Sequence, residues 1–353
     1  MPQNILFIGR GTHLTCGAGH QARALMENEG QLKAAGFDLT FEHALSNEEL
    51  IQKGTLRDYD AVLLLVAWRD SVDEVCRTLE KIRKGQRGKL AFIDYTDQSC
   101  SPHWAALPLV DHFIKPHLLS PIDNYGNTYE GGYIFTDFLK RQMNYELEDW
   151  YFHSPLDFKY ADRIQLGWNM ASLERYRRIS SLGNRFTLAF RFRPVDINLR
   201  FTVGNYQNKS AWYTKYRQAT KDIVKTLKRR RFSGEERLPF KRYLLDLSLS
   251  KIVVSPFGWG EVCYRDYEAV ACGSLLIKPS MEHLITEPNI FIPNKTYVPV
   301  RWDLSDLKEK CDYYLNHPAQ AQQIIANASR AFQSFFHEQT IVKRMAEILG
   351  QGH

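Results

Sequence analysis

The sequence predicts an α/β protein with two doubly wound domains, and three observations lead to this fold class. The chain of 353 residues is long enough for two domains of ordinary size. Short aliphatic runs alternate with segments of helical spacing along most of the chain, which is typical of parallel sheets covered by helices. Each half also carries a glycine-rich loop directly after an expected strand, at residues 10–19 and 255–260. In this fold class, ligands bind beyond the carboxyl ends of the strands.

The first half contains five expected strands with helices between them. Helix starts are indicated by the capping pattern Ser46-x-x-Glu49 and by Ser71. The expected strands are residues 4–9, 37–41, 61–66, 89–93 and 110–115, and the expected helices are 20–35, 47–53 and 71–84. Residues 120–170 lose this regularity and are expected to be an excursion followed by a linker. The alternation therefore predicts one doubly wound domain over residues 1–165.

The second half repeats the alternation. The expected strands are residues 187–194, 252–254, 275–277 and 289–293, and the expected helices are 212–231, 239–249, 264–272, 306–315, 319–332 and 338–349. We therefore expect a second domain over residues 166–335. The remaining residues, 336–353, are expected to be a helix that crosses back to the first domain.

The most informative segment is residues 251–279, which reads as strand, loop, helix and strand. Gly258 and Gly260 leave backbone N–H groups uncovered at the entry to the helix, where the helix dipole favours an anion. Arg265 lies in the first turn, and its guanidinium suits a diphosphate. Glu268 follows three residues later on the same side of the helix. The spacing alone is equally consistent with a solvated ion pair between these two side chains.

The run RDYEAVACGS at residues 265–274 resembles the donor-binding motif of GT-B glycosyltransferases, in which a helix reading R-x-x-E-A-x-A-x-G precedes an apolar strand. The version of the motif with an arginine three residues before the glutamate is similar to that of the exostosin-like and protein O-glucosyltransferase-like branches. The resemblance implies two Rossmann-like domains that face a cleft, and a nucleotide-sugar donor such as a UDP- or GDP-sugar. It assigns Arg265 and the loop 258–260 to the diphosphate, Glu268 to the ribose and Trp259 to the base or sugar. It also implies that no metal is required.

One departure from the motif bears on stereochemistry. In the retaining, group-1-like branch a second glutamate lies eight residues before the one that matches Glu268. That position holds Gly260 here, and the nearest acid, Glu261, is offset by one residue. The departure favours an inverting mechanism over a retaining one.

An inverting transferase needs a base that accepts the proton of the acceptor hydroxyl. Asp94 and Asp97 follow the strand 89–93 and are the first candidates, because two carboxyl groups cluster at a sheet edge there. His13, in the first glycine-rich loop, is the third candidate, since imidazole titrates near neutral pH. The structural alternative is that these residues make local hydrogen bonds or cap a turn.

Two arginines near the start of the second domain extend the expected donor site. Arg191 and Arg193 lie in the expected strand 187–194 and share one of its faces. In proteins with the resembled fold, the loop after this strand lends a basic residue to the donor diphosphate. The two side chains are therefore expected to join Arg265 in a phosphate clamp, with an exposed basic strand end as the alternative.

Composition limits the partners. The formal net charge of +6 suits an anionic ligand but is too small to indicate nucleic acid. The basic run at residues 228–231 allows a peripheral membrane contact or, alternatively, is a solvated helix end. The six cysteines form no C-x-x-C pair, and no signal peptide is evident, so we expect a cytoplasmic protein without a metal site.

Together these features predict a metal-independent glycosyltransferase that acts on a glycan, lipid-linked or small-molecule acceptor. Two alternatives belong to other classes. One is a catalytically inactive binding or scaffold subunit, which would bind nucleotide without turnover. The other is a sugar phosphorylase or epimerase, and a phosphorylase would use inorganic phosphate instead of a nucleotide.

Overall fold

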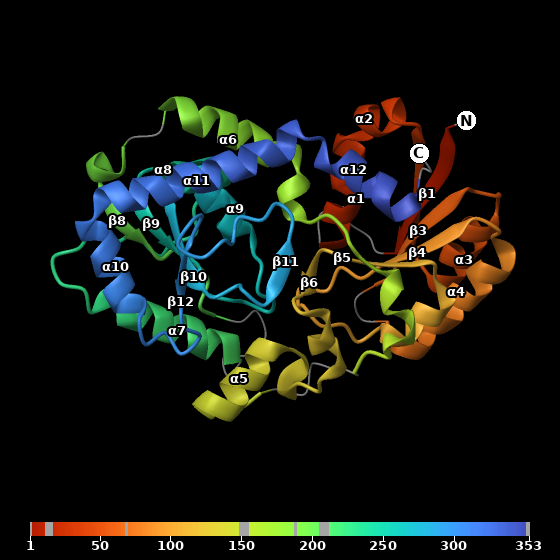
Figure 1. Cartoon of the computed structure of the whole chain (residues 1–353), viewed down its shortest axis with the longest axis horizontal. Helices are drawn as coiled ribbons and strands as arrows, with labels where there is room; N and C mark the ends of the chain where they lie inside the picture. Colours follow the sequence, from red (N-terminus) through yellow and green to blue (C-terminus); the bar gives the residue numbers. More distant parts are fainter. Residues whose placement is uncertain are drawn as a thin grey trace. The chain divides into compact units, whose positions relative to one another are not determined.

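The computed structural model describes residues 2–10, 17–67, 70–147, 155–186, 189–204 and 212–350. The chain divides into two compact units. Unit 1 comprises residues 1–128, 152–174 and 337–353, and unit 2 comprises residues 129–151 and 175–336. Each unit has its own parallel sheet with helices packed around it (Figure 1). The predicted α/β class with two parallel sheets is therefore confirmed.

Unit 1 is built on a six-stranded sheet in the order β2-β1-β3-β4-β5-β7, with every pair parallel. Its strands are β1 (Gln3–Arg10), β2 (Phe37–Ala44), β3 (Ala61–Leu65), β4 (Lys89–Ile93), β5 (His112–Lys115) and β7 (Ile164–Leu166); the short β6 (His117–Leu119) follows β5. All five residues of β3 are buried, as expected of a central parallel strand that has helices on both faces.

Two of the helices of unit 1 begin at local capping signals. The helices of this unit are α1 (Gly17–Glu27), α2 (Glu29–Ala34), α3 (Asn47–Thr55), α4 (Val72–Gly85) and α12 (Thr340–Leu349). The Ser46 hydroxyl accepts the Glu49 N–H before α3, and Ser71 and Glu74 form a capping box before α4. The single helix expected over residues 20–35 is wrong: the chain forms α1 and α2, which are separated at Asn28. Near the C-terminus, Lys89 donates to the Leu349 carbonyl at 2.6 Å, which ties α12 to β4.

Unit 2 is built on a four-stranded parallel sheet in the order β12-β10-β9-β8. Its strands are β8 (Val195–Asn198), β9 (Ser250–Val254), β10 (Leu275–Pro279) and β12 (Val298–Val300), with the short β11 (Leu284–Thr286) after β10. The helices are α5 (Ile134–Met143), α6 (Glu174–Phe186), α7 (Trp212–Lys225), α8 (Phe240–Ser248), α9 (Tyr264–Ala271), α10 (Leu307–Asn316) and α11 (Pro318–His337). Helices α8 and α11 lie on one side of this sheet, and α7 lies on the other (Figure 1).

The predicted unit over residues 251–279 is confirmed as β9, a loop, α9 and β10, with β9 and β10 parallel. Helix α9 ends where Gly273 adopts φ +68°, a conformation that favours glycine. The Gly273 N–H donates to the Val270 carbonyl, and the Ser274 N–H donates to the Ala269 carbonyl. Only three residues therefore separate the end of the helix from β10.

Two expected strands of the second half are wrong. In place of the strand 187–194, the described residues Phe190–Phe192 form a 3-10 turn, and the first strand of the sheet is β8, which begins at Val195. Residues 289–293 form no strand either. The Ile290 N–H bonds back to the Pro288 carbonyl and the Asn289 side chain accepts the Phe291 N–H, so the backbone turns locally. The sheet edge is β12 instead.

Candidate functional site

The N-terminus of α9 lies at the carboxyl ends of β9 and β10, under the glycine-rich loop. Asp266 fixes it there: one carboxylate oxygen accepts the Cys263 N–H at 2.9 Å, and the other accepts the Ser255 hydroxyl at 2.6 Å. Lys278, at the end of β10, lies 3.1 Å from the same carboxylate, and both side chains are fully buried. Because these contacts join the loop, the helix and the neighbouring strand, the shape of the loop is set before any ligand binds.

Two guanidinium groups meet beside this loop. Arg265, in the first turn of α9, lies with Nη1 3.4 Å from the Ser255 hydroxyl and with its charge over the ring of Phe201. Arg217, from α7, donates Nε to the Phe257 carbonyl and Nη1 to the Thr202 carbonyl, both at 3.0 Å. Three segments that are distant in the sequence, the loop after β8, the helix α7 and the loop after β9, therefore converge here.

The charge of Arg265 is offset only in part: burial lowers the pKa of this guanidinium, and nearby acidic groups, Asp266 and Glu268 among them, outweigh that effect and raise it. Within the part of the chain that the structure describes, neither Arg217 nor Arg265 forms an ion pair with a carboxylate, and the buried Nε of Arg265 has no hydrogen-bond acceptor. Burial, and to a smaller extent the neighbouring charge of Arg265, lower the pKa of Arg217 to about 10. Two adjacent cations at a helix N-terminus make a site for an anion that carries at least two charges.

Gly258 leaves room for one of these cations. A Cβ atom at this position would lie 2.5 Å from Nη2 of Arg217, and the Gly258 N–H is already bonded to the Gly260 carbonyl. Since a side chain here would displace the guanidinium, the glycine serves the close approach of a charged group to the backbone.

Glu268 is 94% buried by its neighbours, with 6% of its surface exposed, and it accepts a hydrogen bond from the Tyr243 hydroxyl of α8 at 2.9 Å. Burial raises the pKa of this carboxyl group, and the Tyr243 hydrogen bond and the charges of Arg265 and Arg175 offset that only in part. No ion pair joins Glu268 to Arg265 among the described residues. The alternative of a solvated Arg265–Glu268 pair is therefore wrong, and the two side chains remain available for separate contacts.

The other loop residues of the predicted site have partners in unit 2. Trp259 packs on Tyr213, with ring centroids 4.5 Å apart, and meets Trp212 edge-on. Glu261 is fully buried, and its carboxylate lies 3.4 Å from Nε2 of His283. Gly260 is buried beside them. These contacts hold the loop against the rest of unit 2.

Arg193 does not lie with the two converging arginines. It precedes β8, and it donates Nη1 to the Ser250 carbonyl at 2.8 Å and to the Ser274 hydroxyl at 3.0 Å, where β9 and β10 begin. It therefore lies at the amino edge of the sheet, opposite the loop after β9. Burial lowers its pKa to about 10. Arg191 is exposed and stacks on Phe192. The expected phosphate clamp of Arg191, Arg193 and Arg265 is corrected, because the strand begins after these arginines and not before them.

In unit 1, Asp94 follows β4 at the carboxyl edge of the sheet, and it is locked in an ion pair. Its carboxylate lies 3.0 Å from Nζ of Lys115, and the two side chains are 1% and 0% exposed. Burial raises the pKa of Asp94, but Lys115, His103, Ser101 and Thr96 outweigh it and bring the pKa to about 2. A buried carboxylate with so low a pKa is a poor proton acceptor near neutral pH, so Asp94 has a structural role.

Of the two remaining candidates for the base, only Asp97 is among the described residues. Asp97 lies three residues after Asp94 and is exposed. His13 belongs to residues 11–16, which lie outside the described residues. Asp97 is thus the described candidate whose carboxyl group can meet a substrate.

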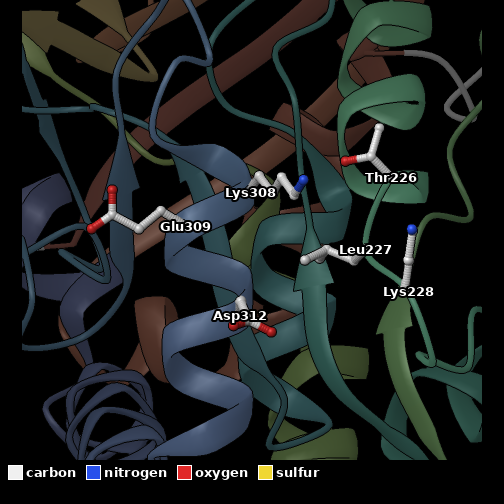
Figure 2. A pocket seen from close by; sticks show the side chains of 6 residues that line it. All are labelled: Thr226, Leu227, Lys228, Lys308, Glu309 and Asp312. Carbon is white, nitrogen blue, oxygen red and sulfur yellow. The ribbon is translucent and has the colours of Figure 1, made fainter.

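A separate hollow of about 460 Å³ lies between the end of α7 and the start of α10, and Figure 2 shows the side chains that line it. They carry both signs of charge and include none of the candidate site residues: Thr226, Leu227, Lys228, Lys308, Glu309 and Asp312. Lys228 begins the basic run 228–231, which follows the end of α7 at Lys225 and is not part of a helix. The mixed charges of the side chains around the hollow do not indicate a particular ligand.

No three His, Cys, Asp or Glu side chains of the described residues come together in the manner of a metal site. None of the described helices combines the length and the apolar character that crossing a membrane requires.

Sequence reasoning missed Arg217, Tyr243 and Phe201. Arg217 and Tyr243 each lie in an amphipathic helix whose register predicts burial but not which partner is met. Phe201 was missed because the first strand of this sheet was expected at residues 187–194. The loop that contributes Phe201 instead follows β8, which ends at Asn198. The sequence did place Arg217 four residues after Tyr213, on the same face of the helix, but a shared face by itself indicates only packing.

Comparison with known proteins supports these observations. Residues 185–350 match the family model described as glycosyl transferase-like. No curated protein matches the chain in sequence. The fold resembles solved structures over the whole chain at low identity. A glycosyltransferase from Rickettsia africae ESF-5 has a TM-score of 0.52 at 12% identity and covers 99% of this chain and 100% of that one.

Two further solved structures are similar. The lipopolysaccharide outer core galactosyltransferase WaaB, in its apo form, has a TM-score of 0.52 at 11% identity, with 98% of this chain and 99% of that one covered. An alpha-glucosyltransferase in complex with UDP and a 13-mer DNA has a TM-score of 0.51 at 8% identity, with 97% and 100% covered. At these identities the likeness shows the fold.

Proposed function

We propose that this chain, a glycosyltransferase of the GT-B fold, takes its sugar from a nucleoside diphosphate donor whose two phosphates are held by Arg265 and Arg217. The observation that carries the proposal is the convergence of two guanidinium groups at the N-terminus of α9, beside Gly258, neither of which forms an ion pair with a described carboxylate. A diphosphate matches this arrangement in charge and in its number of acceptor oxygens. UDP-sugars are the first donors to test, since an alpha-glucosyltransferase of similar fold is solved with UDP.

In the proposed reaction, the acceptor hydroxyl oxygen attacks the anomeric carbon of the donor sugar. The bond between that carbon and the diphosphate oxygen breaks, and its electron pair leaves with the diphosphate. Arg265 and Arg217 stabilise the negative charge that develops on the leaving group, which is the role a metal ion would otherwise have. Their burial strengthens this effect, because the surroundings screen charge less than water does.

We propose that the transfer inverts the anomeric carbon, with Asp97 or His13 accepting the acceptor proton. The loop after β9 supports inversion, because Gly260 occupies the position of the first glutamate of retaining relatives and Glu261 is buried against His283. Nuclear magnetic resonance of the first-formed product tests this, since its anomeric configuration is opposite to that of the donor in an inverting reaction. Retention in the product would contradict both the base and the single-step mechanism.

Calorimetric titration of the full chain with UDP, GDP, CMP and inorganic phosphate tests the donor site. We expect one nucleoside diphosphate to bind, and Arg265→Ala and Arg217→Ala each to weaken it by about 1.5–3 kcal/mol, the range for a charged hydrogen bond. Arg191→Ala is the matched control, because Arg191 is an exposed arginine of the same unit. Repeating the titration in EDTA tests metal independence. If no nucleotide binds, or if the two variants bind it like the wild type, the proposed donor site is wrong.

A further inference from the structure

A third arginine of unit 2 lies among aromatic rings next to Glu268. Arg175 is in the first turn of α6, and its guanidinium carbon lies 4.8 Å from the ring centre of Tyr176, 5.3 Å from that of Tyr264 and 5.7 Å from that of Phe240. Its Nη2 donates to the Tyr176 hydroxyl at 3.0 Å. The three rings hold the guanidinium in one place, because each ring face attracts a cation.

The hydrogen-bonding capacity of Arg175 is largely unused. Within the described part of the chain, its buried Nε has no acceptor and no carboxylate forms an ion pair with it. A guanidinium carries five N–H donors, and a buried donor without an acceptor costs free energy. A side chain that is fixed by rings but short of acceptors is therefore preorganised for an acceptor that arrives with a ligand.

The position of Arg175 next to Glu268 indicates which part of a ligand supplies this acceptor. Tyr264 lies one turn before Glu268 on α9, and Phe240 lies three residues before Tyr243 on α8. The two helices that hold Glu268 and its Tyr243 partner thus also supply two of the rings around Arg175. The charge of Arg175 reaches Glu268 as well, since it lowers the pKa of that carboxyl group. Tyr264 and Arg265 are consecutive residues in the first turn of α9, and at about 3.6 residues per turn they lie on opposite flanks of the helix face that carries Glu268.

A nucleotide has the matching order of groups: diphosphate, ribose and base. If the diphosphate meets Arg265 and the ribose meets Glu268, the base extends toward the next group in the row. Phe240 is 45% exposed, so its ring has free surface on which a flat base can stack. The planar, forked donors of arginine suit a carbonyl oxygen at the edge of such a base.

We propose that Arg175, Phe240 and Tyr264 form the nucleobase subsite, and that Arg175 selects bases with a carbonyl acceptor, such as uracil or guanine, over adenine. Adenine presents an amino donor where those bases present a carbonyl, and two donors facing each other cannot form a hydrogen bond. This inference rests on the proposed function, because it takes the diphosphate and ribose contacts as given.

The test compares ligands with and without a base. Calorimetry measures the Kd values of UDP, GDP, ADP and pyrophosphate for the wild type, Arg175→Met and Arg175→Lys. For whichever of UDP and GDP the wild type binds, we expect Arg175→Met to weaken binding about tenfold, with less than about twofold change for ADP and pyrophosphate. Arg178→Met, which changes an exposed arginine of the same helix, is the control and should leave all four values unchanged.

The lysine variant covers the case in which the methionine variant fails to fold. Lysine keeps the charge but loses the planar fork, so we expect it to lose most of the preference for the carbonyl-bearing base over adenine. An equal loss for pyrophosphate and UDP, or no loss at all, overturns the base subsite. If UDP or GDP binds and depends on Arg265 while the Arg175 variants are unchanged, this inference alone is wrong. If the wild type binds neither a nucleotide nor pyrophosphate, the proposed function fails with it.

Discussion

The Tyr243 hydroxyl donates to Oε2 of Glu268 at 2.9 Å, and this contact joins α8 to α9 at the side of the candidate donor site. It occupies one oxygen of a buried carboxylate and fixes its orientation. The other oxygen is the one that can accept a ribose hydroxyl. Tyr243 is therefore a positioning residue in the proposed site, acting through Glu268.

Tyr243→Phe should weaken UDP or GDP binding by about 1 kcal/mol, with little change in fold, because Glu268 loses the hydrogen bond that orients it. The hydrogen bond lowers the pKa of Glu268, so its removal raises that pKa further. Since ribose binding needs an ionised acceptor, the loss of affinity at acid pH should begin at a higher pH in the variant. Calorimetry from pH 5 to pH 8 measures both effects. An unshifted acid limb would show that Glu268 does not bind the nucleotide in its ionised form.

Gly258→Ala should weaken diphosphate binding about tenfold, because the new Cβ atom would lie 2.5 Å from Nη2 of Arg217 and displace the guanidinium. Thermal stability should change little, since the displaced atom is the end of a long side chain. Gly30→Ala is the matched control, because a Cβ atom at that helical glycine meets nothing within 4 Å. A Kd for pyrophosphate equal to that of the wild type would separate Arg217 from the phosphate site.

Arg193→Met should destabilise the protein without changing the Kd for nucleotide. The variant leaves the Ser250 carbonyl and the Ser274 hydroxyl without their buried donor, which costs about 1–3 kcal/mol. Urea unfolding and calorimetry give the two quantities separately. Arg191→Met, at the exposed neighbour, should change neither. A selective loss of nucleotide affinity in Arg193→Met would restore the clamp predicted from sequence.

The Asp94–Lys115 pair predicts a pH-dependent stability. The pKa of Asp94 is depressed to about 2 in the folded protein, below its usual 3.8. The pair therefore stabilises the fold at pH values above about 4, and this contribution, about 2 kcal/mol, is lost as the pH falls from 4 toward 2. Asp94→Asn should remove that part of the acid sensitivity.

The control for this prediction is Asp38→Asn, which changes the exposed ion pair with Lys33. We expect less than about 0.5 kcal/mol there, because exposed pairs are screened by solvent. Breaking the buried pair should cost about 3–5 kcal/mol at neutral pH, since it leaves Lys115 as an unpaired buried charge. Equal effects of the two variants in urea unfolding at pH 7 would contradict the structural role of Asp94.

Local sequence patterns were enough to predict the class of the fold and to place the centre of the candidate site in one segment. Apolar runs of five residues between helical segments fix parallel strands, because only buried strands tolerate apolar residues on both faces. The glycines, Arg265 and Glu268 lie within eleven residues of one another, so their placement depends on one local strand–loop–helix unit. Local hydrogen bonding sets such a unit, and the Ser46 and Ser71 caps were predictable for the same reason.

Which distant residues join the candidate site depends on the tertiary structure. Arg217 lies 48 positions from Arg265 in the sequence, and Arg175 lies 90 positions from it. The strand order β12-β10-β9-β8 brings the loop after β8 and the helix α7, which carries Arg217, next to the loop after β9, which precedes Arg265. The expected strand 187–194 ends where β8 begins, at Val195. This error of a few residues placed Arg193 at the carboxyl edge of the sheet in the prediction, whereas it lies at the amino edge. Neither spacing nor propensity encodes that choice; the packing of the whole unit makes it.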